Sequence, residues 1–181
     1  MVKIKGNSLF LVKRYILDKY GKEEYGQIVS QCSDDTWDIL NSAILSTVDY
    51  DWKAYLELIT SFLRMKGKEA LLPLSEYKCR EQLNWLYKAM LKVTPWKIFV
   101  TNGQIIWNIH FTHGSAVGEF ASEGSFVIHL SGIPFNKAIG EHFSHYMRVF
   151  YEFASSQKME CSYRLIDSTH LDLIYSILPE V

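Results

Sequence analysis

The sequence has few of the residues that build disulfide frameworks, metal sites or membrane spans. Its 181 residues include three cysteines, Cys32, Cys79 and Cys161, which are odd in number and too widely spaced for a zinc ligand set. No apolar run approaches the roughly 20 residues that cross a bilayer. The N-terminal residues also lack the apolar segment of a secretory signal. We therefore expect a cytoplasmic protein that does not insert into membranes.

An excess of charge of either sign is also missing. The chain carries 19 basic and 20 acidic residues, a formal net charge of −1. Binding to nucleic acid or to an anionic membrane draws on a surplus of lysine and arginine. The balance therefore predicts no nucleic-acid partner.

The motifs of common catalytic sites are absent as well. The sequence has no Gly-x-Ser-x-Gly elbow, no phosphate-binding glycine loop and no His-Glu-x-x-His. His142 and His145 share one flank of an expected helix, and Glu141 precedes His145 by four residues, a spacing that predicts an ion pair on an exposed rim. No further cysteine or carboxylate has the spacing to complete a metal site. We expect no catalytic residues, no metal and no enzyme activity.

What the sequence does have is a helical first half. Apolar residues at helical spacing, with Ser, Asp or Asn before them and Gly or Pro after them, predict helices. The expected helices cover residues 7–20, 22–31, 33–40, 51–65 and 75–92. Pro73 is placed outside the last of these, residues 41–50 are expected to form a loop, and no strand is expected before Pro95.

Beyond Pro95 the period of the apolar residues changes to two, which is typical of strands. The expected strands cover residues 104–112, 116–121, 125–131, 159–165 and 171–177. Between the third and the fourth, Asn136 is a candidate N-cap for one long helix with an aromatic stripe. The prediction is an α+β fold: a helical subdomain, 1–94, then a four- to five-stranded antiparallel sheet packed on one long helix, 95–181, forming one unit.

The chain is rich in aromatic residues, with 5 tryptophans, 11 tyrosines and 10 phenylalanines. Such side chains either fill a core or line a small-molecule pocket. His129, between apolar neighbours on a presumed central strand, is either a core histidine or faces a pocket between sheet and helices. The candidate ligand-binding residues are Trp85, Trp96, Trp107, His110 and His129.

Four short segments carry a resemblance that spans nearly the whole chain. They are KGNSL at residues 5–9, YGKEE at 20–24, Thr94–Pro95, and LSGIP at 130–134. In this order they resemble the haem nitric-oxide/oxygen-binding (H-NOX) fold and its haem-free relatives. Those relatives include an uncharacterised myxobacterial family and the 4-vinyl-reductase-like small-molecule-binding domains.

The chain departs from the haem-binding members of that family at two places. Those members have a proximal histidine before the Thr-Pro junction and a Tyr-x-Ser-x-Arg signature for the haem propionates. Here Leu83 and Asn84 lie about where the histidine would be, and His129-Leu-Ser131-Gly-Ile133 replaces the signature. The cysteine-rich hairpin of the 4-vinyl-reductase-like domains is reduced to Cys161.

The resemblance, without these residues, implies a sensory or signalling module that binds no cofactor. Such a module is expected to act by binding a signalling protein partner or a small hydrophobic ligand. The alternative is a gas or small-molecule sensor that holds haem or another hydrophobic molecule in a non-standard pocket. A homodimer is also expected, because cyclic dimers are the commonest assemblies.

Overall fold

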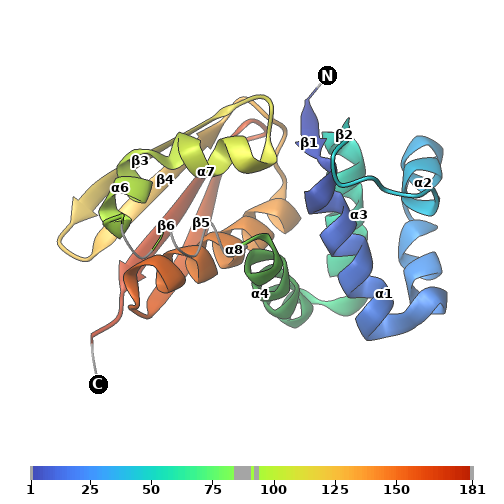
Figure 1. Ribbon diagram of the computed structural model, residues 1–181, viewed down its shortest axis with the longest axis horizontal. Helices are drawn as coiled ribbons and strands as arrows, with labels where there is room; N and C mark the ends of the chain where they lie inside the picture. The colour runs from blue at the N-terminus through green and yellow to red at the C-terminus, as the bar shows by residue number, and fades with distance from the viewer. Residues whose placement is uncertain (1, 84–90, 92–93, 180–181) are drawn as a thin grey trace.

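Two groups of elements lie side by side in the computed structural model, which describes residues 2–83, 91 and 94–179 (Figure 1). The first group contains β1 (Lys3–Lys5), α1 (Gly6–Val29), α2 (Asp34–Asn41), β2 (Asp49–Asp51), α3 (Trp52–Lys66), a 3₁₀ turn (Lys68–Ala70) and α4 (Leu71–Gln82). The second contains α6 (Trp96–Thr101), α7 (Gly103–His110), β3 (Ser115–Ser122), β4 (Ser125–Ser131), α8 (Lys137–Ser155), β5 (Met159–Asp167) and β6 (His170–Ile177). This α+β composition confirms the predicted fold class. The expected boundary between residues 94 and 95 stays a prediction.

The second group is an antiparallel sheet with the strand order β3-β4-β6-β5. Phe126, Ile128 and Leu130 of β4 are buried, while the residues between them are partly exposed. This alternation is the predicted one, and it turns one face of the sheet toward α8. Figure 1 shows α8 lying against the sheet, with α4 between α8 and the helices α1 and α3.

Helix α8 forms as its sequence predicts. The side-chain oxygen of Asn136 accepts a hydrogen bond from the backbone N–H of Ile139 at 2.9 Å, which confirms Asn136 as the N-cap. The predicted break at Gly21 is also present: its φ of 83° interrupts α1, a conformation that glycine adopts without a steric penalty.

The predicted strand at residues 104–112 is wrong, because most of this segment forms α7. Ile106, Trp107 and His110 are buried and follow a helical spacing, whereas Ile105 on the opposite side is 49% exposed. Since Ile105, Ile106 and Trp107 are consecutive apolar residues, the segment satisfies a period of two and a period of 3.6 equally well. Among the described residues, the main sheet therefore has four strands.

Two further expectations for the first half need correction. Strands β1 and β2 pair with each other and have only three residues each, too few to produce a recognisable period. Helix α4 begins at Leu71 and not at Ser75, so Pro73 lies in its first turn, where a backbone N–H has no helical partner to lose. Most of the predicted continuation to residue 92 lies outside the described residues.

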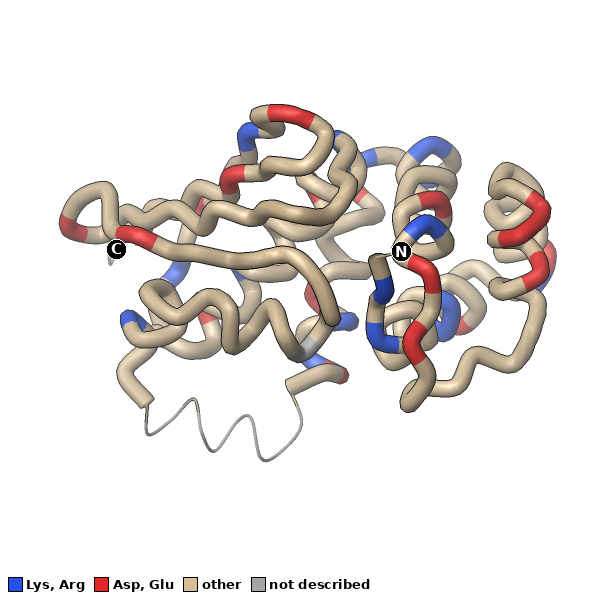
Figure 2. Tube along the Cα trace, turned by 90° about the horizontal axis from the view of Figure 1, so that it is seen from above, with Lys and Arg blue, Asp and Glu red and all other residues tan. Residues whose placement is uncertain are grey.

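The described helices include none that is long and apolar enough to cross a membrane. Figure 2 shows basic and acidic residues interspersed along the described trace, as the balanced composition predicts.

Candidate functional site

A chain of buried polar side chains runs through the junction of the two groups. His142 of α8 is fully buried, and its Nε2 lies 2.7 Å from the Tyr55 hydroxyl of α3. Its Nδ1 lies 2.9 Å from Ser75 Oγ of α4, which itself donates to the Leu71 carbonyl at 2.7 Å. Because the Ser75 hydroxyl gives its one proton to the Leu71 carbonyl, it must accept from His142. The Nδ1–H of His142 therefore donates to Ser75, and Nε2 accepts from Tyr55. This histidine therefore ties α3, α4 and α8 together.

A second buried histidine, His110, connects α7 to α8 and to α1. Nε2 of His110 lies 3.0 Å from the Tyr146 hydroxyl of α8, and Nδ1 lies 3.0 Å from Ser8 Oγ of α1. The Gln82 amide of α4 donates to the same serine at 3.1 Å. The carbonyl oxygen of Gln82 is buried and has no hydrogen-bond partner among the described residues.

Lys78 of α4 lies between the two histidine centres. Its Nζ is 4.5 Å from the ring centre of Tyr146 and 5.2 Å from that of Tyr55, both cation–π distances. Burial lowers the pKa of Lys78 to about 7. Burial, followed by the charge on Lys78, holds the pKa of His110 and of His142 well below its usual range. At neutral pH the histidines are neutral, and the lysine is poised between its charged and neutral forms.

Aromatic rings fill the rest of the junction. The Phe111 ring centre lies 4.1 Å from that of Trp107, 5.2 Å from that of Trp52 and 5.9 Å from that of Phe143. The backbone of Phe111 also forms a bridge with Ile4 of β1. The Trp52 indole donates to the Pro134 carbonyl at 2.7 Å, so its polar atom is satisfied inside the cluster. Aromatic side chains of the protein therefore fill most of the junction between the two groups of elements.

The rings leave a small cavity between α7, α8 and the sheet, with a volume of about 30 Å³. Its walls are mainly apolar, and Lys78, His110 and Tyr146 are the polar residues in the lining. The apolar lining includes Ile106, Trp107, Ala116, Phe143 and Met147. A space of this size holds about one or two water-sized molecules.

The structure separates the residues that the sequence grouped as candidates. Trp107 and His110 line the cavity, whereas Trp96 lies at an outer groove beside Phe120. His129 is on the other face of the sheet, with its side chain 42% exposed, where Asp172 at 2.7 Å and Glu119 at 3.4 Å accept its hydrogen bonds. The hydrogen bond to Asp172 raises the pKa of His129. Trp85 lies outside the described residues.

Sequence reasoning missed Lys78 and misplaced His142. The buried face of α4 includes Leu71, Leu74, Lys78 and Gln82, so helical spacing alone places Lys78 in an apolar stripe. The expectation that His142 lies on an exposed rim is wrong, since it is fully buried. The expected pair of Glu141 and His145 is confirmed, with 3.0 Å between Oε1 and Nε2.

The Tyr55 hydroxyl gives a direct test of this network. Tyr55→Phe is expected to lower the free energy of unfolding by about 1–3 kcal/mol, because it leaves the buried Nε2 of His142 without a donor. The matched control is Tyr77→Phe, since the Tyr77 hydroxyl is buried and has no hydrogen-bond partner among the described residues. That change is expected to be neutral or slightly stabilising. If urea titrations show the same loss of unfolding free energy in both variants, the Tyr55 hydroxyl does not stabilise His142 as described.

The described residues of the junction do not fit the haem that the H-NOX resemblance implies. Leu83, the described residue near the expected ligand position, is an apolar side chain that cannot coordinate iron. Ser131 Oγ is hydrogen-bonded to Ser115 Oγ at 2.8 Å, and Ile133 is fully buried where the family signature has an arginine. The remaining cavity, about 30 Å³, is smaller by a factor of about ten or more than the roughly 300–1,000 Å³ of typical cofactor pockets.

Comparisons with known proteins identify the fold. No protein-family model and no curated protein sequence matches the chain. Among solved structures, the Fe(II) unliganded H-NOX protein from K. algicida is 15% identical over 98% of both chains, with a TM-score of 0.72. The Fe(II)NO H-NOX protein from S. oneidensis is 10% identical over 97% of this chain and 99% of that one, with a TM-score of 0.66. The chain has an H-NOX-like fold.

Proposed function

We propose that this protein is a non-catalytic sensory or signalling module of H-NOX-like fold that works without haem. The observation that carries the proposal is the packing of Trp52, Trp107, Phe111 and Phe143 in the junction, where the described residues leave a cavity of about 30 Å³. The H-NOX protein from S. oneidensis, which has this fold, is known in an Fe(II)NO ligation state. Here the cavity and the buried polar chain beside it are what a signal can act on.

The cavity limits the ligand to a small apolar molecule. Its lining is mostly apolar, and a ligand much larger than a water or a diatomic gas would have to displace Phe143 or Met147. Lys78, Tyr146 and His110 border the same space and hydrogen-bond or pack onto α1, α3 and α7. A ligand that changes the protonation of Lys78 would change the contacts that hold these helices together.

A protein partner is the second route by which such a module acts. An outer groove runs between α6, the end of β3 and the end of β6, with the apolar residues Trp96, Phe120, Ile177 and Leu178 in its lining. Phe120 and Leu178 are exposed large hydrophobic residues, a composition typical of interaction surfaces. A signalling protein or a second copy of the chain would cover this groove. The three free cysteines accord with a reducing cytoplasm as the place of action.

Xenon is a suitable probe for the cavity, because it is apolar and enters dry cavities of proteins. We expect NMR spectra under xenon pressure to show saturable shifts of residues lining the cavity, with Ile106 and Met147 among those that shift most. The physical reason is that the apolar wall offers dispersion contacts and few hydrogen bonds to water.

The matched control is Ala116→Leu, which adds three carbon atoms to a buried cavity wall and is expected to abolish the shifts. Phe153→Leu, on the exposed side of α8, should leave them unchanged. Equal shifts in wild type and in Ala116→Leu would contradict a ligand site at this cavity. A sensory role would then depend on a protein partner bound at the outer groove between α6, β3 and β6.

A further inference from the structure

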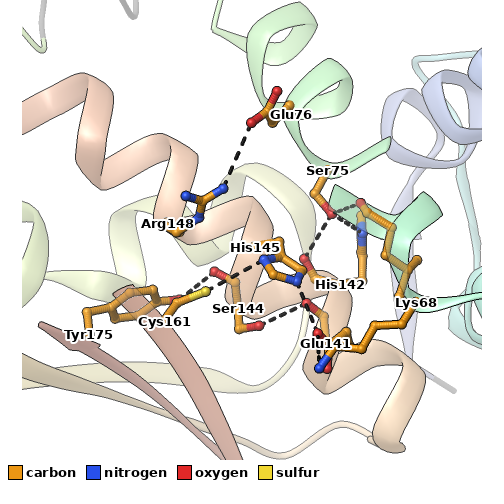
Figure 3. Close-up of polar contacts among 11 residues, drawn as sticks. Lys68, Ser75, Glu76, Glu141, His142, Ser144, His145, Arg148, Cys161 and Tyr175 are labelled. Atoms are coloured by element: carbon orange, nitrogen blue, oxygen red, sulfur yellow. Dashed lines mark hydrogen bonds and ion pairs between the residues drawn. The ribbon is translucent and has the colours of Figure 1, made fainter. Parts of the chain in front are cut away.

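On the side of α8 that faces β5, a thiol, an imidazole and a carboxylate form a line. Cys161 Sγ of β5 lies 3.6 Å from His145 Nδ1, and His145 Nε2 lies 3.0 Å from Glu141 Oε1 (Figure 3). The two ring nitrogens thus face two different partners. A nucleophile, a base and a carboxylate that orients the base are the parts of a nucleophilic triad.

The fold holds all three residues in place. Glu141 and His145 are separated by one helical turn, and Glu141 is also paired with Lys68 Nζ at 3.0 Å. Cys161 is on the edge strand β5, on the side that packs against α8. The carboxylate lies beyond the far nitrogen of the imidazole. The three groups therefore do not converge on a point, and no metal-binding group of three such residues is found in the described part of the chain.

The resting protonation states suit a reaction that needs a base. Burial raises the pKa of the Cys161 thiol, and burial lowers the pKa of His145 despite the opposing effect of Glu141. At neutral pH this gives a thiol beside a neutral imidazole that can accept its proton. The charged groups acting on the imidazole are Glu141, Arg148 and Lys68; those acting on the thiol are Arg148, Glu141 and Glu152.

An unused hydrogen-bond donor lies one turn further along α8. Nε of Arg148 is buried and has no hydrogen-bond partner among the described residues. The other guanidinium nitrogens face Glu152 at 3.4 Å and Glu76 at 3.9 Å. The positive charge of Arg148 also acts on Cys161 and His145. A buried donor of this kind is suited to an oxyanion that forms near the thiol.

We propose that Cys161 is an acyl-acceptor site for activated esters or thioesters. His145 Nδ1 takes the thiol proton as Sγ attacks the carbonyl carbon, and the Arg148 Nε–H donates to the carbonyl oxygen. The new S–C bond forms, the ester C–O (or thioester C–S) bond breaks with its electron pair on the leaving group, and His145 returns the proton to that group. Glu141 is a positioning residue. This inference does not rest on the proposed function.

The test uses p-nitrophenyl acetate on the full chain, with p-nitrophenolate release and peptide mass spectrometry as readouts. Cys32 is the internal reference: it is partly buried, its pKa is likewise raised by burial, and its Sγ faces Ser61 and the Ile28 carbonyl. We expect Cys161 to be acetylated at least about tenfold faster than Cys32 at pH 7, since base catalysis contributes about 10²–10⁴-fold.

Two variants separate chemistry from structure. His145→Gln is expected to slow acetylation of Cys161 about 100-fold and to make its rate rise with pH up to the pKa of the thiol. Glu141→Gln is expected to slow it less and to move the acid limb of the pH profile to lower pH, because Glu141 raises the pKa of His145. The rate at Cys32 should stay unchanged in both, which reports an intact fold. Acetylation of Cys161 no faster than that of Cys32, or unchanged by His145→Gln, would overturn the proposal.

Discussion

Replacing Lys78 with methionine is expected to raise the free energy of unfolding at pH 7 by about 2–4 kcal/mol. The shift of its pKa from 10.5 to about 7 corresponds to roughly 4–5 kcal/mol of stability that the charged lysine costs the folded protein. Methionine has a similar length and no charge, so it removes this cost and keeps most of the packing. The lost cation–π contacts with Tyr55 and Tyr146 offset part of the gain.

The same change alters the pH dependence of stability. The unfolded chain holds the Lys78 proton up to about pH 10.5, whereas the folded protein releases it above about pH 7. Wild-type stability should therefore rise with pH across this interval, with a smaller slope in Lys78→Met, and the advantage of the variant should shrink toward pH 10. Urea titrations between pH 6.5 and 10 measure both effects. The control Lys158→Met, at a side chain 82% exposed, should change stability by less than about 0.5 kcal/mol. If Lys78→Met is less stable than wild type and its stability changes with pH as steeply, Lys78 is not a buried group with a lowered pKa.

Replacing Phe111 with alanine is expected to lower the free energy of unfolding by about 3–5 kcal/mol. The ring is buried and contacts Trp52, Trp107 and Phe143, so its removal leaves a cavity that these rigid neighbours cannot fill. The control is Phe153→Ala, because Phe153 is 44% exposed and its truncation should cost less than about 1 kcal/mol. Thermal and urea unfolding of both variants give the comparison. A loss at Phe111 no larger than at Phe153 would contradict a junction filled by aromatic rings.

The elements that the sequence predicted correctly are those whose signals are local. The N-cap Asn136, the stripe of α8 and the alternation in β4 each follow from a few neighbouring residues. The error at α7 has a physical cause, since a run of apolar residues buried against a core has no distinctive period. Packing between the two groups of elements, and not the local sequence pattern, makes residues 103–110 a helix.

The same limit applies to the candidate site. The pair Glu141–His145 lies within one helix turn, so its spacing was enough to predict it. Cys161 comes 16 residues after His145, and their contact depends on how β5 packs against α8. Lys78 was missed because a charged residue is normally expected to face solvent. Its burial becomes apparent only from its helical spacing to the buried residues Leu71 and Leu74. Tertiary contacts of this kind are what the sequence alone did not reveal.

The visible absorption spectrum of the protein, purified from cells supplied with haem and then titrated with it, tests the central claim most directly. We propose that aromatic side chains of the protein fill the junction and leave no room for haem. We expect no Soret band in the purified protein and a haem titration without a saturable shift, for wild type and for His110→Ala alike. A stoichiometric Soret band in wild type, lost in His110→Ala, would show that haem enters the junction and would contradict the account.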